Sequence, residues 1–232
     1  MTATRRERLA DDALLLHLGA ETPPIDDATN ARVHRLAARI RAAAPAWLRD
    51  LVPAYASLAV FFDPDAIDAS DVERWLDAQL ADGDSATVAT GSRCIEIPVV
   101  YGGDFGEDLD SAAQELGITA DALTARHAAG IYTVAMIGFA PGFPYLSGLD
   151  PALALPRLAT PRTRVPAGSV AIGGAQTGLY PRESPGGWRL IGRTPLRLFD
   201  PTRASPSLLA PGDRVRFVSI DADAFARMDA ET

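Results

Sequence analysis

The chain has 232 residues, of which 47% are hydrophobic and 22% are charged, and its formal net charge is −8. This composition is typical of a globular protein with one or two domains, and the acidic balance argues against a general nucleic-acid binder. All 22 basic residues are arginine. The chain therefore cannot carry the lysine of a phosphate loop, a Schiff-base lysine or a biotinylated lysine.

Cysteine content and hydropathy point to the cytoplasm. Cys94 is the only cysteine, which excludes an internal disulfide framework and suits a reducing compartment. No apolar run approaches the roughly 20 residues of a membrane span. The first residues, MTATRRERLADD, lack the apolar stretch of a secretory signal, so we expect none.

The first part of the chain alternates strand and helix patterns. Apolar runs predict strands over 13–18, 58–62 and 93–100, and apolar residues at helical spacing predict helices over 30–43 and 70–80. Asp27 or Thr29 is available as the N-cap of the first helix. Strand, helix, strand, helix, strand indicates an α+β protein whose N-terminal α/β domain, residues 1–97, is ferredoxin-like.

The second part, residues 98–232, changes character. Helices are predicted over 108–116 and 119–128, and short β runs separated by Gly and Pro follow at 131–137, 169–172, 189–191, 196–199 and 215–220. Many short strands with dense turn signals favour a barrel or a sandwich. The tail after Ala222 is polar, and we expect it to be frayed.

Residues 138–195 form the most distinctive segment. They hold ten of the 19 glycines and nine of the 18 prolines, and seven arginines from Arg157 to Arg197 lie there or just beyond, against only Asp150 and Glu183. On an extended strand Arg162 and Arg164 would project to one face, and Arg189 adds a third guanidinium. Because arginine suits carboxylate and phosphate, we predict a surface for an anion or an acidic partner.

Other polar residues leave alternatives open. Glu183 is either a general base or the partner of Arg182 or Arg189 in an ion pair. His127 ends a predicted helix, where it either complements the helix dipole or has a functional role. Gln176 and Tyr180 supply uncharged hydrogen-bonding groups beside a glycine-rich turn. Three scattered histidines and one cysteine give no zinc spacing, and no G-x-S-x-G elbow is present.

Several strings resemble one known family. They are YGGDFGEDL (101–109), GFAPGFPYLSGLD (138–150), PRLATPRTRVPAGSVAIGGAQTGLYPRESPGGWRLIGRTPLRLFDP (156–201) and LLAPGDRVRFVSI (208–220). The chain is similar over about residues 10–220 to the family of the 5-oxoprolinase B subunit, also described as KipI-like or allophanate hydrolase subunit 1. The resemblance implies an N-terminal α/β domain and a C-terminal cyclophilin-like β-barrel.

The resemblance also implies an activity and partners. Members act with a homologous second subunit, and in the oxoprolinase with a third, lactam-utilisation subunit. Together they open 5-oxo-L-proline to L-glutamate with hydrolysis of ATP, in the presence of Mg²⁺. We expect Glu183 and His127 as catalytic residues, and a substrate or anion site made by Arg162, Arg164, Gln176, Tyr180 and Arg189. We expect no metal site and no biotin on this chain.

Two other functions fit the same resemblance. One is half of a urea- or allophanate-type biotin-dependent carboxyltransferase, with biotin carried on another chain. The other, from a different class of protein, is an inhibitor of a sensor histidine kinase, in which the arginines would meet acidic residues of the kinase.

Overall fold

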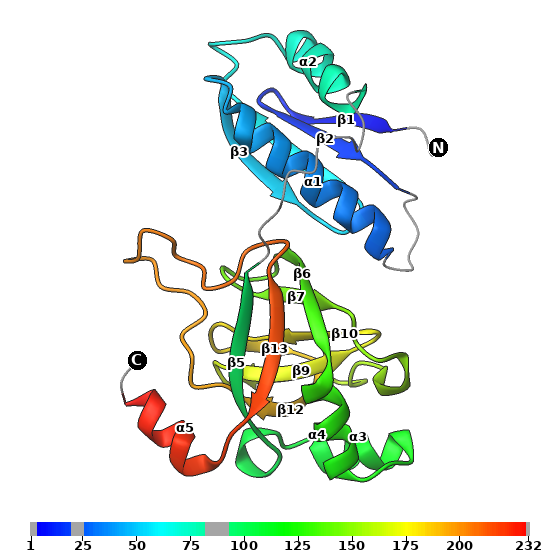
Figure 1. Cartoon of the computed structure of the whole chain (residues 1–232), viewed down its shortest axis with the longest axis vertical. Coiled ribbons are helices and arrows are strands. Elements are labelled where there is room, and N and C mark those ends of the chain that lie inside the picture. The colour runs from blue at the N-terminus through cyan, green and yellow to red at the C-terminus, as the bar shows by residue number, and fades with distance from the viewer. Residues whose placement is uncertain (1–3, 20–25, 82–92, 231–232) are drawn as a thin grey trace. The chain divides into compact units, whose positions relative to one another are not determined.

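A computed structural model of the chain describes residues 4–19, 26–81 and 93–230, and it divides the chain into two compact units, Met1–Gly91 and Ser92–Thr232 (Figure 1). Each unit has its own buried apolar core. No helix of the described residues is long and apolar enough to cross a membrane.

The N-terminal unit is an antiparallel sheet covered by two helices. The strands are β1 (Arg5–Ala10), β2 (Ala13–His17), β3 (Leu48–Pro53) and β4 (Ser57–Phe62), in the order β1-β2-β4-β3. The helices are α1 (Asp27–Ala43) and α2 (Ala69–Ala81). Alternate residues of the central strands point toward the helices, because the side-chain period of a strand is two. The core consists mainly of Leu14, Leu16, Val33, Leu36, Ile40, Leu58, Val60, Val72 and Leu76.

Local signals explain where α1 begins. The Asp26 carboxylate accepts hydrogen bonds from the backbone N–H groups of Ala28 and Thr29, which have no partner within the helix. The N-cap is thus Asp26, one residue before the first position that we predicted, and the helix begins at Asp27.

The order of elements in this unit differs from the strand–helix alternation that we predicted. The sequence indicated neither β1 nor β3, and the described order is β-β-α-β-β-α. All six residues of β1 are exposed and most are charged, so the strand carries no apolar pattern. It forms because its backbone pairs with the edge of β2, from Arg5 opposite His17 to Ala10 opposite Ala13.

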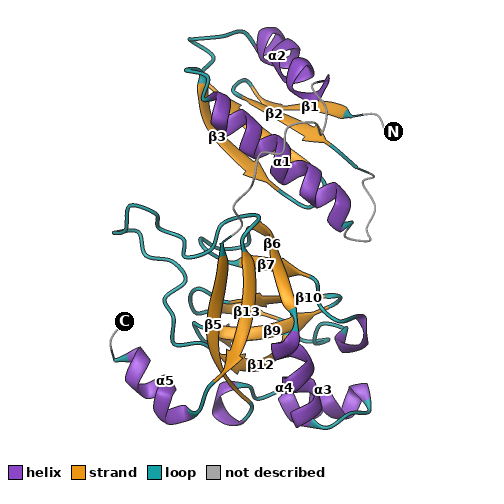
Figure 2. Cartoon of the chain, viewed as in Figure 1, coloured by secondary structure: helices purple, strands orange, loops and turns teal. Residues whose placement is uncertain are grey.

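The second unit is a closed seven-stranded barrel, which fits the cyclophilin-like fold that the resemblance implied (Figure 2). Around the barrel the order is β10-β7-β6-β13-β5-β12-β9. These strands are β5 (Cys94–Tyr101), β6 (Ile131–Ile137), β7 (Pro144–Ser147), β9 (Ser169–Gly173), β10 (Gln176–Leu179), β12 (Arg189–Arg193) and β13 (Arg214–Ser219). The boundary that we expected after residue 97 falls inside β5, which pairs with β13 and β12.

Shorter elements surround the barrel. They are the 3-10 turns η2 (Gly103–Phe105) and η3 (Pro151–Leu153), the helices α3 (Leu109–Leu116), α4 (Ala120–Ala129) and α5 (Ala222–Asp229), and the two-stranded sheet of β8 (Arg162–Val165) with β11 (Ser184–Gly186). Figure 2 shows α3 and α4 side by side at one end of the barrel. The Thr119 hydroxyl accepts the N–H of Ala122 and so caps α4.

Two predictions for this unit were wrong. Residues 196–199 form no strand and contribute only an isolated bridge between Phe199 and Ser207. The tail after Ala222 is not frayed: it is helix α5, whose N-cap Asp221 accepts the N–H of Ala224. Phe225 on this helix packs against Phe105, with ring centroids 4.8 Å apart. This apolar contact stabilises the helical conformation of an otherwise polar segment.

Candidate functional site

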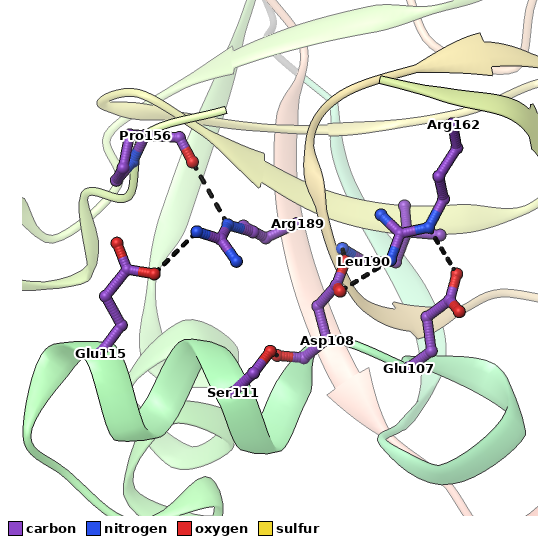
Figure 3. Close-up of polar contacts among 8 residues, drawn as sticks. All are labelled: Glu107, Asp108, Ser111, Glu115, Pro156, Arg162, Arg189 and Leu190. Carbon is purple, nitrogen blue, oxygen red and sulfur yellow. Dashed lines mark hydrogen bonds and ion pairs between the residues drawn. The ribbon is translucent and has the colours of Figure 1, made fainter. Parts of the chain in front are cut away.

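All seven predicted site residues lie in the barrel unit, where all three arginines among them are already paired with carboxylates. Arg162 on β8 donates from Nε to Glu107 at 2.8 Å and from Nη2 to Asp108 at 2.7 Å (Figure 3). The other oxygen of Asp108 accepts the backbone N–H of Leu190 at 2.7 Å. Asp108 is buried, so this carboxylate ties the start of α3 to β8 and β12.

The Arg162 guanidinium remains charged in this setting. Burial alone would lower its pKa, but the hydrogen bonds and attraction of Asp108 and Glu107 raise the pKa overall. The third guanidinium nitrogen, Nη1, is buried and has no hydrogen-bond partner in the described part of the chain. Two of the three guanidinium nitrogens of Arg162 are thus bound to carboxylates of the protein, and the third is enclosed.

Arg189 is held in the same way on the barrel strand β12. Its Nη2 donates to Glu115 of α3 at 2.7 Å, and its Nε donates to the carbonyl oxygen of Pro156 at 3.3 Å (Figure 3). Only 17% of its side chain is exposed. The residue fastens α3 and the segment around Pro156 to β12.

Arg164 and Glu183 form a pair at the surface. The guanidinium of Arg164 donates to both oxygens of Glu183, at 3.0 and 2.8 Å, and the two side chains are 76% and 54% exposed. The hydrogen bond from Arg164 keeps the pKa of Glu183 below its ordinary value, so Glu183 in this pair is a weak base. Glu183 does form an ion pair, but with Arg164 and not with Arg182 or Arg189.

From the period of a strand we predicted that Arg162 and Arg164 present their guanidinium groups on one surface. In the structure they do not. The pairing of β8 with β11 is irregular: Val165 lies opposite Ser184, but Arg162 lies opposite Gly186. Such a bulge inserts an extra residue and breaks the simple alternation of side chains. The two arginines consequently bind different carboxylates.

His127 lies inside the barrel core and is fully buried. The Thr177 hydroxyl donates to the carbonyl of Ala171 at 2.9 Å, so it accepts from Nε2–H of His127, also at 2.9 Å. Nδ1 then accepts from the Tyr101 hydroxyl at 2.8 Å. The ring stacks on Phe217, with centroids 4.6 Å apart.

The surroundings of His127 keep its ring neutral. Burial lowers its pKa from 6.5 to about 3. A neutral, enclosed ring with both nitrogens engaged cannot contact a substrate in this structure, so our prediction of a catalytic His127 is corrected. Its hydrogen bonds instead join α4 to strands β5 and β10 across the barrel.

Gln176 and Tyr180 are also buried, at 9% and 2% exposed. Tyr180 packs edge-on against Phe143, with centroids 5.1 Å apart, and burial raises the pKa of its hydroxyl. The hydrogen bond with the Trp188 backbone and, to a smaller extent, the guanidinium groups of Arg157 and Arg162 partly oppose that rise in pKa. Gln176 and Tyr180 lie beneath the surface, where they can position other groups but do not present a face to solvent.

Comparison with known proteins agrees with this architecture. Residues 4–209 match the family described as the carboxyltransferase domain, subdomain C and D. The chain belongs to this carboxyltransferase-domain family.

Two relatives that this chain covers over more than nine tenths of their length carry the same name. The chain is 41% identical over 224 residues to the B subunit of 5-oxoprolinase from Bacillus subtilis (strain 168), covering 92% of each chain. It is 43% identical over 222 residues to the B subunit of 5-oxoprolinase from Escherichia coli O157:H7, covering 94% of this chain and 97% of the relative.

Solved structures of similar proteins include longer chains. The chain is 40% identical to the protein TTHA0988, with a TM-score of 0.78, and the match covers 90% of this chain but only 40% of that one. The urea amidolyase of K. lactis has the same fold at 20% identity, with a TM-score of 0.75 over 98% of this chain and 15% of the amidolyase. The carboxyltransferase-domain unit thus also exists as part of larger polypeptides.

The sequence reasoning missed the acids that neutralise the arginines of this carboxyltransferase-domain chain. We counted only the acids within residues 138–195, whereas the partners Glu107, Asp108 and Glu115 lie before them in the chain. Glu107 and Asp108 stand in the string YGGDFGEDL, which we interpreted only as a mark of the family resemblance and not for its charge. A search for adjacent acids near the start of a helix would have found them.

Proposed function

We propose that the chain is a subunit of an ATP-dependent 5-oxoprolinase that converts 5-oxo-L-proline to L-glutamate together with a homologous second subunit. The observation that carries this proposal is the identity of 41% and 43%, over more than nine tenths of the chain, to two proteins named as the B subunit of 5-oxoprolinase. The alternatives, half of a biotin-dependent carboxyltransferase and an inhibitor of a sensor kinase, have no comparable support in these names.

The exposed pair of Arg164 and Glu183 is our candidate for the substrate-facing part of the site. Water screens an exposed ion pair, which therefore contributes little to stability, so a competing anion can open it easily. Arg164 would then bind the carboxylate of 5-oxoproline, and Glu183 would orient the attacking water and accept its proton. Water adds to the lactam carbonyl carbon, the ring C–N bond breaks, and the nitrogen takes up a proton to become the amine of glutamate.

The buried groups act as positioning residues in this scheme. Arg162, through Asp108, and Arg189, through Glu115, fix the elements on which Arg164 and Glu183 stand. Tyr180 lies against β11, where its hydroxyl approaches Gly186, and Gln176 is buried in β10. A rigid base of this kind holds reacting groups in position, which is where much of the rate enhancement of enzymes originates.

The ATP requirement is met, in our proposal, mainly by the partner subunits. ATP would activate the lactam by transferring its γ-phosphoryl group to the amide oxygen, which releases ADP and makes the lactam carbon more electrophilic. After the ring has opened, a second water would release this group as inorganic phosphate and leave the carboxylate of glutamate. The residues of this chain do not fit a triphosphate well, because Arg162, Arg164 and Arg189 are each engaged with a carboxylate and the chain has no lysine. We therefore propose that ATP and Mg²⁺ are bound by the partner subunits, which include a third, lactam-utilisation subunit.

Two further features belong to this proposal. We propose a ferredoxin-like arrangement for the N-terminal unit. In this arrangement β1 lies at the edge of the sheet beside β2, in the position that the last strand of a ferredoxin-like domain occupies. With a single cysteine in the sequence, we also propose that the complex works in the cytoplasm.

The test is ATP-dependent release of glutamate from 5-oxoproline by the chain reconstituted with the subunits encoded alongside it. We expect turnover only when all subunits and ATP are present. Absence of turnover, under conditions in which a known oxoprolinase is active, would refute the proposed function.

A further inference from the structure

Arg193 on β12 differs from the arginines of the candidate site. Its Nη2 donates to the carbonyl oxygen of Asp104 at 3.3 Å, and among the described residues no carboxylate lies within ion-pair distance of it. Arg162, Arg164 and Arg189 are each paired with a carboxylate. Arg193 therefore carries a positive charge that the described part of the protein does not neutralise.

The neighbours of Arg193 position its side chain without an ion pair. The guanidinium lies 5.8 Å from the centroid of the Phe105 ring, which is a cation–π arrangement. The stem passes Gly168, where an added Cβ atom would lie 3.3 Å from Cγ of Arg193. The hydrogen bond to Asp104 is long, and the side chain is partly exposed. These contacts direct the guanidinium but are weak enough to yield to a stronger partner.

The part of the guanidinium nearest the backbone is enclosed. Nε of Arg193 is buried and has no hydrogen-bond partner within residues 4–19, 26–81 and 93–230. A buried donor, above all a charged one, costs free energy unless an acceptor completes it. Nε of Arg193 therefore needs an acceptor from outside the described chain.

Ser169 on β9 supplies a second polar group at this position. It lies directly opposite Arg193 in the pairing of β9 with β12, so the two side chains are on the same face of the sheet. Ser169 is fully buried, and its backbone N–H and carbonyl are bound to Pro166 and Tyr180. Its hydroxyl, however, has no hydrogen-bond partner in the part of the chain that the structure describes. The hydroxyl, like Nε of Arg193, can donate to an acceptor.

The chemistry of this pair decides which kind of ligand fits it. An oxyanion accepts hydrogen bonds from both groups and also neutralises the charge of Arg193, which a water molecule does not. Carboxylate and phosphate are the oxyanions whose geometry suits a guanidinium. One guanidinium and one hydroxyl match a single oxyanion group and not a polyphosphate chain.

We propose that Arg193 and Ser169 form a binding site for a single oxyanion, a carboxylate or a phosphate in its chemistry. Nε and the hydroxyl are closed to solvent in this structure, so the oxyanion binds as the partly exposed Arg193 side chain changes rotamer, a fast motion for a side chain at the surface. Asp104, which holds Arg193, and Asp108, which holds Arg162, belong to the same short segment before α3. The oxyanion site therefore adjoins the candidate site.

The proposed reaction contains an oxyanion of this kind. The phosphoryl group on the lactam oxygen, later released as inorganic phosphate, is a single phosphate, and Arg164 already has the substrate carboxylate as its proposed partner. We therefore assign phosphate to the oxyanion site. This assignment rests on the proposed function, whereas the site itself rests on the two buried groups and the charge of Arg193.

The test is isothermal titration calorimetry of the full chain with inorganic phosphate at constant ionic strength. We expect saturable binding that Arg193→Gln weakens by at least about 10-fold, the loss that accompanies a charge-assisted hydrogen bond. Ser169→Ala should weaken binding by about 3–10-fold and yet leave the melting temperature unchanged or higher, because it removes a buried hydroxyl that no described group completes. A role of Ser169 in packing alone would leave the affinity for phosphate unchanged.

Arg157→Gln is the matched control. Arg157 is exposed and its guanidinium also lies 5.8 Å from an aromatic ring, that of Trp188. This variant makes the same chemical change away from Ser169, and we expect its affinity for phosphate to stay within about threefold of the wild type.

Competition with 5-oxoproline identifies the source of the oxyanion. We expect 5-oxoproline not to displace phosphate. Displacement would confirm the oxyanion site but assign it to the substrate carboxylate, and it would overturn our assignment of that carboxylate to Arg164.

Three results would overturn the oxyanion site. They are absence of saturable binding of either anion to the wild type, unchanged affinity in both Arg193→Gln and Ser169→Ala, and equal weakening by Arg157→Gln. These titrations need neither ATP nor the other subunits. A reconstituted complex that releases no glutamate consequently refutes the proposed function and not the oxyanion site.

Discussion

Asp108 and Arg162 are joined by a hydrogen-bonded ion pair of 2.7 Å although 54 residues separate them in the chain. The second oxygen of the same carboxylate accepts the backbone N–H of Leu190. One buried side chain thereby fixes the start of α3, the strand β8 and the strand β12 relative to one another. This makes Asp108 an anchor of the candidate site.

We predict that Asp108→Asn destabilises the protein by about 2 kcal/mol, because it removes a charge-assisted hydrogen bond from a largely buried guanidinium. The free energy of unfolding from urea denaturation measures this loss. The matched control is Glu107→Gln, which changes the neighbouring carboxylate on the same arginine. Glu107 is 58% exposed, so we expect a loss of less than about 1 kcal/mol. Equal losses in the two variants would show that Asp108 is not the anchor.

Much of the fold was predictable because apolar periodicity marks elements that bury one face. The predicted strand over 58–62 and helix over 119–128 correspond closely to Ser57–Phe62 and Ala120–Ala129. The missed elements lack that signal. Strand β1 is wholly exposed and forms by backbone pairing, whereas β10 is a short Gln-Thr-Gly-Leu segment whose four residues are all buried in the closed barrel.

The candidate site was less predictable, since its geometry depends on which distant residues meet. Seven arginines close together in sequence suggested an open cationic surface, but packing of the helix α3 region brings Asp108 and Glu115 onto two of them. The sequence likewise placed His127 at the end of a helix without showing that the barrel closes over it. The pairing of these arginines and the burial of His127 both depend on long-range packing, which no local sequence pattern specifies.

We predict that His127 makes stability depend on pH. Its pKa is about 3 in the folded protein and 6.5 in the reference state, so the unfolded chain takes up the proton first as the pH falls. The stabilisation is complete above about pH 6.5 and decreases toward pH 3, with a slope of up to about 1.4 kcal/mol per pH unit. Between pH 7 and 5 the wild type should lose about 2 kcal/mol more of its unfolding free energy than His127→Gln. Urea denaturation at both pH values checks this, and identical losses would contradict it.

A third prediction concerns the close approach of Tyr180 to the backbone of β11. A Cβ atom added at Gly186 would lie 2.3 Å from the Tyr180 hydroxyl oxygen, so Gly186→Ala should destabilise the protein by about 1–3 kcal/mol. At the adjacent Gly187 the nearest atoms would lie at 3.6 Å, and Gly187→Ala should be nearly neutral. Melting temperatures of the two variants give the comparison.

The same clash predicts a rescue. Tyr180→Phe removes the oxygen that the methyl group introduced by Gly186→Ala would meet, so the double variant should be more stable than the sum of the two single losses predicts. Additive losses would mean that the close contact does not limit the backbone at this position.

The last prediction separates the activity of Arg164 from its contribution to stability. Because the Arg164–Glu183 pair is exposed and screened by water, Arg164→Ala should leave the unfolding free energy nearly unchanged and the assembled complex intact. Turnover of 5-oxoproline should nevertheless fall by at least about 100-fold, since the substrate carboxylate loses its partner.

Arg216, which pairs with Glu96 at the surface of β13 and β5, supplies the control for that experiment. Both arginines belong to exposed ion pairs, with 76% and 52% of their side chains accessible, so Arg216→Ala makes the same chemical change in a similar setting. We expect Arg216→Ala to retain full turnover. If both variants stay active, Arg164 does not contact the substrate. If both lose activity, the loss reflects the general charge of the surface and not a specific site at Arg164.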